Sequence, residues 1–291
     1  MQIRQVRGRQ TMLVLLACAV VLSGCSRMNL AYRNLDLLIP WSLNDYLDMN
    51  RDQQTRFRAQ LREHISWHCR TQLPDYLDLI ERLQAQVRQG SLDEPALRTH
   101  YENAQKAIQT IALEITPTTV QLLRDLEDRQ VRELDEQFEK DRQKREKKYL
   151  QPPADQQIRE RTDRMQERAE QWLGKVSSAQ RQRIQEWART LSEQNQLWLD
   201  NRAQWQRSLV DAVRNRDQAD FDERVARLLQ DREVYWTAPY RAAFPAIEQA
   251  TIDLVVDLYD MADATQRRHI HQRLQDMRRD LGSLDCLPAR P

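Results

Sequence analysis

Two histidines in the first third of the chain have a spacing that could bind a metal ion. His64 and His68 are four residues apart, so on a helix they share one face, as two ligands of a zinc site do. Ile65 stands where a zincin helix carries its catalytic glutamate, and further ligands would have to come from residues such as His269 or His271. The same spacing fits a partly buried pair hydrogen-bonded to backbone or carboxylate groups, and both interpretations stay open.

Covalent catalysis finds little support in the sequence. No Gly-x-Ser-x-Gly motif is present, and Cys69 beside His68 does not make a nucleophile–base pair, because consecutive helical residues point in different directions. Of the five glycines, only Gly90, Gly174 and Gly282 follow the first 24 residues, which argues against glycine-rich phosphate-binding loops. We therefore expect a protein that is not an enzyme.

The amino-terminal segment has the pattern of a secretory signal peptide. Arg4, Arg7 and Arg9 precede an apolar run over 12–22, and small residues follow that run. The run is too short to cross a bilayer as a helix, which needs about 20 residues. The pattern predicts a leader that is removed after export.

Cys25 is the residue at which this leader ends. The sequence Leu22-Ser23-Gly24-Cys25 resembles the lipobox of bacterial lipoproteins. The resemblance implies cleavage between Gly24 and Cys25, a diacylglycerol on Cys25, and acylation of the new amino terminus. Ser26 occupies the position where Asp favours retention in the inner membrane, so the resemblance implies attachment to the outer membrane, facing the periplasm. Membrane lipid is then a partner through Cys25, and no other cofactor is expected.

Charge is abundant but balanced. Lys plus Arg number 45 and Asp plus Glu number 44, giving a net charge of +1. Removal of the leader lowers this to about −2, because the leader carries three arginines and no acidic residue. Nucleic-acid-binding proteins show a basic excess that this chain lacks, so we expect no nucleic-acid partner.

Two cysteines remain once Cys18 and Cys25 are set aside. Cys69 and Cys286 would face an oxidising compartment, where a disulfide between them could fasten the carboxy-terminal tail to an early helix. The alternative is a pair of free thiols, one of them buried as a small apolar side chain.

The apolar periodicity predicts an all-α fold, an elongated array of antiparallel helical hairpins with long, charged, coiled-coil-like helices. Helical patterns cover 50–73, 76–89, 94–115, 118–150, 155–173, 177–215, 220–235, an apolar stretch around 252–259, and 263–281. A break is expected at Thr116-Pro117, and Pro239 and Pro245 frame a bend. Tryptophans 187, 198 and 205 follow near-heptad spacing, which fits either an aromatic ligand groove or core packing along a helix seam.

The chain divides into a signal peptide (1–24), a lipid anchor with a lead-in segment (25–49) and a helical domain (50–291). Within that domain, 118–150 places acidic residues first and basic residues last, which complements the helix macrodipole. Its charged end is predicted either to project from the core, as an arm within 118–153, or to fray.

Three helix starts share one frame: an apolar residue, a cap residue, two free positions, Gln, and an apolar residue four positions on. The glutamines are Gln53, Gln180 and Gln266. Capping boxes explain the frame, since Asn, Ser and Asp are preferred N-caps and Gln at the third helical position completes the box. The frame is also similar to the Leu-Thr-x-x-Gln repeats of small helical periplasmic stress chaperones, although no threonine is present at the cap.

A broader resemblance covers most of the mature chain. A family of uncharacterised helical lipoproteins of Gram-negative bacteria is similar in these features: the lipobox, Leu38-Ile39-Pro40-Trp41, Tyr46-Leu47-Asp48, Gln53, Trp67-His68 and Leu73-Pro74-x-Tyr76. The resemblance implies fold and location but no activity. We expect a non-enzymatic envelope protein that binds other proteins, as a scaffold or a chaperone-like protein. The alternative is a lipoprotein that binds a metal or small ligand through His64 and His68.

Overall fold

The computed structural model describes residues 32–284 and 286, and it confirms the all-α prediction. These residues form no strand. The leader, the lipobox and Cys25 lie outside the described residues. None of the described helices combines the length and apolarity needed to cross a membrane. The helices are α3 (Leu35–Leu47), α4 (Arg51–Thr71), α5 (Leu73–Gln89), α6 (Glu94–Arg124), α7 (Asp128–Tyr149), α8 (Ala154–Leu173), α9 (Ser178–Thr190), α10 (Gln194–Arg214), α11 (Phe221–Gln230), the 3-10 turn η1 (Arg232–Tyr235), α12 (Ala238–Asp260) and α13 (Ala264–Gly282).

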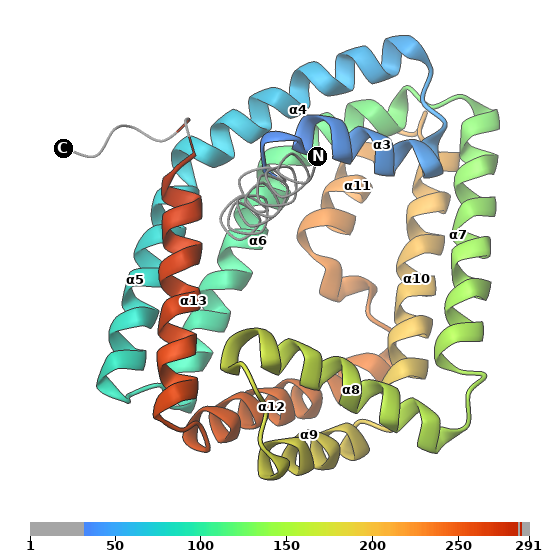
Figure 1. Ribbon diagram of the computed structural model, residues 1–291. Helices are drawn as coiled ribbons and strands as arrows, with labels where there is room; N and C mark the ends of the chain where they lie inside the picture. The colour runs from blue at the N-terminus through green and yellow to red at the C-terminus, as the bar shows by residue number, and fades with distance from the viewer. Residues whose placement is uncertain (1–31, 285, 287–291) are drawn as a thin grey trace, which may run out of the picture.

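The helical hairpins close into a four-sided ring (Figure 1). One side holds α3 and α4, the next holds α5 and α13, the third holds α8, α9 and α12, and the fourth holds α7 and α10. Helix α6 contacts both α4 and α12, and α11 packs on α6. The antiparallel hairpins are therefore as predicted, but the array is closed on itself instead of open and elongated.

The order of helix contacts repeats along the chain. In the first half, α3 packs on α4 and on α7, and α4 packs on α6. In the second half, α8 packs on α9 and on α13, and α9 packs on α12. Helices α3 to α7 thus correspond in order to α8, α9, α10, α12 and α13, with α11 and η1 as an addition to the second half. The chain is built from two similar halves.

The two halves exchange a helix, so neither encloses its core alone. Helix α5 of the first half packs against α13 of the second, and α10 of the second half packs against α7 of the first. One apolar core accordingly joins Val87 of α5 to Ile184, Leu258 and Leu274 of the second half. The other joins Val213 of α10 to side chains of α3, α4, α6 and α7. We conclude that the halves are interlocked.

Four glutamines lie in the first turn of four of the ring helices. Each is the third residue of its helix, Gln53 in α4, Gln130 in α7, Gln180 in α9 and Gln266 in α13, and all four are buried. Each Oε1 accepts a hydrogen bond from the backbone N–H of its own N-cap residue, namely Asn50 (2.9 Å), Glu127 (2.8 Å), Ser177 (2.9 Å) and Asp263 (3.2 Å). Capping boxes are therefore present, as the sequence predicted, but at four helix starts and not three.

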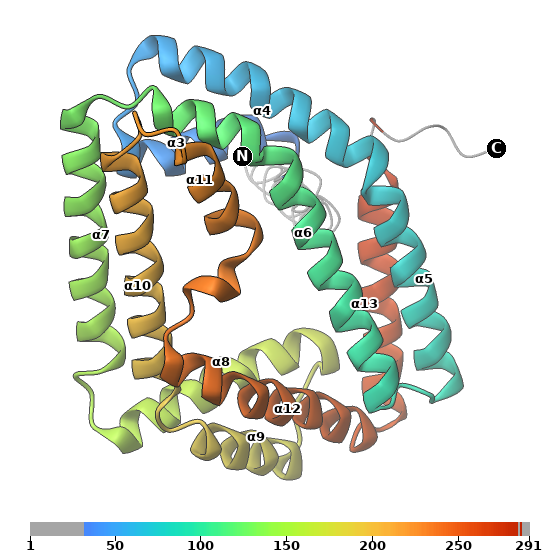
Figure 2. The same ribbon diagram turned by 180° about the vertical axis from the view of Figure 1, so that it is seen from behind.

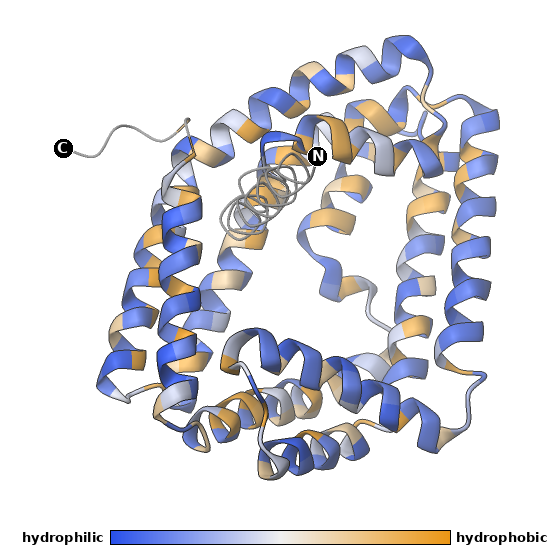
Figure 3. Ribbon diagram, in the orientation of Figure 1, coloured by the Kyte–Doolittle hydropathy of each residue, from blue (hydrophilic) through white to orange (hydrophobic). Residues whose placement is uncertain are grey.

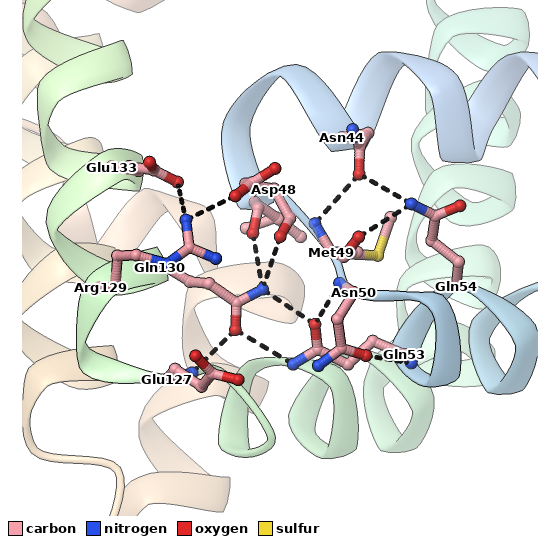
Figure 4. Close-up of polar contacts among 11 residues, drawn as sticks. Asn44, Asp48, Met49, Asn50, Gln53, Gln54, Glu127, Arg129, Gln130 and Glu133 are labelled. Atoms are coloured by element: carbon pink, nitrogen blue, oxygen red, sulfur yellow. Dashed lines mark hydrogen bonds and ion pairs between the residues drawn. The ribbon is translucent and has the colours of Figure 1, made fainter.

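The same four amides meet in two pairs. Gln53 donates to Gln130 at 3.1 Å and accepts from it at 2.8 Å (Figure 4). Gln180 donates to Gln266 at 3.0 Å and accepts from it at 2.9 Å. The pairs lie where α4 meets α7 and where α9 meets α13, at opposite corners of the ring (Figure 1).

Each amide also binds the end of a third helix, the one that comes directly before the helix containing the paired glutamine. The second N–H of each amide donates to a backbone carbonyl there. For Gln53 this is Asp125 (2.7 Å), for Gln130 Leu47 and Asp48 (both 2.9 Å), for Gln180 Leu258 (3.2 Å), and for Gln266 Lys175 (2.7 Å). Every corner thus joins the ends of two helices to the starts of the next two, through side chains whose hydrogen-bonding capacity is filled.

The predicted break at Pro117 is wrong, and the predicted single helix over 118–150 is wrong as well. Helix α6 continues through Pro117 to Arg124. Proline leaves the carbonyl of Leu113 without its helical donor, but Leu113 stands on the exposed side of α6, where water can replace that donor. The chain instead turns between α6 and α7, where Gln53 binds the carbonyl of Asp125.

The expected helix over 177–215 is also divided. Helix α9 ends at Thr190 and α10 begins at Gln194. Leu191, between them, is buried in a core to which α5, α12 and α13 also contribute. The buried Arg161 of α8 donates to the carbonyl of Ala188 at 2.8 Å, near the end of α9. Tertiary contacts therefore end a helix that periodicity alone would continue.

The charged end of α7 lies against α10 and does not project as the predicted arm. Asp141 pairs with Arg145 at 2.8 Å and with Arg202 of α10 at 3.1 Å. Burial raises the pKa of Asp141, but the hydrogen bonds from these two guanidinium groups leave it below its usual value. Tyr149 meets Trp198 of α10 edge to face, with ring centroids 5.7 Å apart.

The glutamine pairs should make a large contribution to stability. Replacing Gln180 by Ala removes a helix cap and leaves buried groups of Gln266 and Leu258 without partners, so we expect a loss of about 2–4 kcal/mol in the free energy of unfolding. Urea denaturation followed by circular dichroism measures it. The exposed Gln182 lies on the same helix, and Gln182→Ala should change stability by about 0.5 kcal/mol or less. Equal effects of the two substitutions would contradict this account.

Candidate functional site

The two ends of the described chain meet at the junction of α4 and α5. Cys69 and Cys286 form a disulfide with Cα atoms 6.0 Å apart. Cys69, Leu73 and Leu284 are buried there, and Tyr32 packs against them. Of the two alternatives open in the sequence, the structure has the bonded pair, and it closes a separation of 217 residues.

The two histidines do not converge on one point. His64 faces α6, where its Nδ1 lies 3.2 Å from Glu114 and its Nε2 lies 2.7 Å from the hydroxyl of Thr118. The Nδ1 of His68 lies 3.0 Å from the hydroxyl of Tyr32. The described residues contain no group of three or more His, Cys, Asp or Glu side chains that could hold a metal ion. The structure therefore favours the hydrogen-bonded interpretation of this pair over the metal site.

His68 and Tyr32 form a partly buried polar contact beside the disulfide. Burial lowers the pKa of His68 below its ordinary value. Burial, together with the nearby Tyr76, raises the pKa of Tyr32 to about 12. Both groups are accordingly neutral near pH 7, and their contact fixes Tyr32, three residues before α3, to α4.

A different part of the molecule forms a cavity with aromatic walls. It has a volume of about 810 Å³ and lies between the middle of α6, the start of α10 and the segment from the end of α11 to the start of α12. We call it the aromatic hollow. Its apolar lining consists of Tyr101, Ile108, Trp198, Trp205, Leu229, Tyr235, Trp236, Tyr240 and Phe244.

Three rings on one wall of the hollow pack against one another in edge-to-face and tilted contacts. The centroid of Trp236 lies 5.2 Å from that of Tyr240 and 4.6 Å from that of Phe244. Thr237 caps α12 by accepting from the backbone N–H of Tyr240, and its own N–H donates to Asn201 of α10 at 3.0 Å. Tyr240 and Phe244 are one turn apart on α12, so the capped start of this helix positions both rings.

Polar groups lie among and around these rings. The indole N–H of Trp205 donates to the carbonyl of Leu228 at 2.9 Å. The Nε of Arg202 is buried and has no hydrogen-bond partner in the protein. Lys106, Arg232 and Glu233 also line the hollow. It therefore combines aromatic surface with several charged groups, a composition typical of protein-binding surfaces.

The tryptophans predicted at heptad spacing separate in the structure. Trp198 and Trp205 line the hollow, whereas Trp187 is buried in the core, with its indole N–H 3.4 Å from the hydroxyl of Thr251. Core packing is thus confirmed for Trp187, whereas an aromatic ligand groove at Trp198 and Trp205 stays a prediction. Sequence analysis missed Trp236, Tyr240 and Phe244, although their four-residue spacing was visible.

Comparison with known proteins places the chain in a family without an assigned activity. The chain belongs to DUF6279, a family of unknown function, whose model matches residues 45–241. No curated protein is significantly similar to the chain, and no solved structure is. The predicted membership of an uncharacterised family is therefore confirmed. The resemblances to lipoproteins and to stress chaperones stay predictions.

The disulfide should stabilise the closed ring. In the chain-entropy model, closing a loop of this length contributes about 5 kcal/mol, and strain reduces the figure. Cys286→Ser should therefore lower the melting temperature measured by circular dichroism. Reductant should lower the melting temperature of the wild-type protein toward that of the variant and leave the variant unchanged. An equal response of both proteins to reductant would contradict the prediction.

Proposed function

We propose that this DUF6279 protein is a lipoprotein of the bacterial outer membrane that faces the periplasm and binds other proteins without catalysing a reaction. The helical domain would act as a scaffold or chaperone-like receptor, and the aromatic hollow would bind a segment of the partner protein. The observation that carries the proposal is the hollow itself, a cavity of about 810 Å³ lined by aromatic rings and charged groups on a closed helical frame.

The chemistry of the hollow supports a protein segment as its occupant. Trp, Tyr and Arg are the residues most enriched among the dominant contacts of protein interfaces. Trp198 and Arg202 come from α10, and Trp236 and Tyr240 come from the segment that η1 and α12 contribute. An apolar or aromatic side chain entering the hollow would displace water from these rings, and a neighbouring acidic group could pair with Lys106 or Arg232.

The sequence before the described residues supports the anchoring part of the proposal. A basic start, a short apolar run and Leu-Ser-Gly-Cys resemble the leader and lipobox of exported lipoproteins. The disulfide between Cys69 and Cys286 is consistent with an oxidising compartment. The metal-binding alternative loses its support, because His64 and His68 face different partners.

Photo-crosslinking in cells tests the hollow as a protein-binding site. Ile108 and Leu113 are both 52% exposed on α6, but only Ile108 lines the hollow. A benzophenone amino acid at position 108 should give protein adducts that the same probe at 113 does not give. Adding Trp236→Ala to the 108 probe should reduce the adducts severalfold, because a main contact ring is lost. Equal labelling at 108 and 113, or no adduct at either position, would refute the proposal.

Acylation of Cys25 tests the anchor separately. Labelling cells with an alkyne-bearing palmitate should mark the protein and place it in the outer-membrane fraction. Cys25→Ala should abolish the label and keep the leader on the chain, because the lipid acceptor and the cleavage position are both lost. Cys286→Ser retains Cys25 and serves as the matched cysteine control. Unchanged fractionation and mass of Cys25→Ala would sink the anchoring proposal.

A further inference from the structure

Helix α3 has apolar side chains on two opposite faces. Ile39, Leu43 and Tyr46 pack against the core shared by α4, α6 and α7. On the other side, Leu37, Leu38 and Trp41 are 52%, 48% and 70% exposed. These three positions fall within an arc of about 100° and form one outward strip, since helical residues advance by about 100° each. We call this strip the outer face of α3.

The fold does not require this face to be apolar. Helix α8 occupies the corresponding position in the second half, and in Figures 1 and 2 both helices lie on the same face of the ring. The exposed residues of α8 are mostly charged or amide-bearing, and Ala154 and Trp172 are the exceptions: Ala154, Asp155, Arg159, Asp163, Glu167, Arg168, Gln171 and Trp172. Figure 3 shows a largely hydrophilic α8 and an α3 in which hydrophobic and hydrophilic residues are mixed. The exposed surface is apolar on α3 and mostly polar on α8, although the two helices are equivalent. Folding alone therefore does not explain the apolar outer face of α3, whereas a binding partner that covers it would.

The position of the candidate lipid identifies that occupant. Seven peptide bonds separate Cys25 from Tyr32. A chain of that length reaches at most about 25 Å even when fully extended. Tyr32 is in turn held to the body, because its hydroxyl lies 3.0 Å from Nδ1 of His68 and 3.3 Å from the carbonyl of Ile65. A lipid on Cys25 would therefore keep Tyr32, just before α3, within about 25 Å of the bilayer surface.

We propose that the outer face of α3, formed by Leu37, Leu38 and Trp41, lies in the interface of the bilayer that holds the lipid anchor. The inference rests on the proposed acylation for its reach. Tryptophan favours the level of the lipid headgroups, and exposed leucines partition into the adjoining acyl region. Asp45, exposed one turn beyond Trp41 on the same side, marks where α3 leaves the interface for water.

This placement would make α3 a second contact beside the anchor. A lipid anchor at one residue leaves a protein free to swing about its tether, whereas a helix seated in the interface fixes one face of the protein toward the membrane. The same face of the ring carries α8, so its charged residues would be directed toward the headgroups.

Quenching of tryptophan fluorescence by brominated lipid tests the placement. The full-length gene is expressed in cells, and the purified protein is mixed with saturating phosphatidylcholine vesicles brominated near the headgroup end of the acyl chains. Mass spectrometry of the same sample reports whether Cys25 carries lipid. Trp41→Phe should remove most of the quenching, a roughly twofold or greater loss. Trp172→Phe, on the equivalent helix α8, should remove no more than its even share among the seven tryptophans.

The outcomes separate this proposal from the proposed function. Missing acyl mass would refute the anchor, whereas absent quenching at Trp41 would overturn the α3 placement whether or not lipid is attached. Equal quenching in Trp41→Phe and wild type would overturn it too. If the protein sediments as a dimer that Trp41→Asp converts to monomer, the outer face belongs to a second copy of the chain and the membrane placement is wrong. Trp41 is 70% exposed, so neither substitution should impair folding.

Discussion

The reciprocal glutamine amide pair is the interaction on which the ring depends. An amide offers two donors and a carbonyl oxygen that accepts two hydrogen bonds, and each of Gln53, Gln130, Gln180 and Gln266 uses all of them inside the protein. A glutamate pair would place two like charges in a buried site, and asparagine is one methylene shorter. The same pair recurs at opposite corners, so one local solution sets the positions of eight helix ends.

The exchange of helices between the two halves explains how the ring stays closed. Because α5 packs on α13 and α10 packs on α7, each apolar core needs helices from both halves. The disulfide between Cys69 and Cys286 then joins the end of the second half to the first. The closed frame keeps the helices that line the aromatic hollow at fixed separations, which a pre-organised binding site requires.

The features with functional potential lie where the two halves differ. The hollow uses the end of α11 and η1, which the first half lacks, and the outer face of α3 is apolar where α8 is polar. Residues at equivalent positions in the two halves form the ring. The hollow and the outer face of α3 depend on features that one half has and the other lacks, and the packing of the ring does not explain them. The repeated arrangement therefore allows an internal comparison, because the equivalent residue in the other half occupies the same place in the fold.

The sequence by itself determined the helical class, most helix starts and the choice of cap residues, because these follow from apolar periodicity and from hydrogen bonds within one turn. It also showed three of the four glutamine frames. The fourth, Leu126-Glu127-x-x-Gln130 with Leu134, follows the same spacing but was hidden inside an apparently continuous helix over 118–150. Only the tertiary structure decided that Pro117 is tolerated, that α6 ends at Arg124, and that the charged end of α7 packs on α10. The tertiary structure alone also decided that His64 and His68 have separate partners and that Trp198 and Trp236 line the same hollow. These contacts join residues more than thirty positions apart, so they depend on which helices meet, and the local periodicity of the sequence does not contain that information.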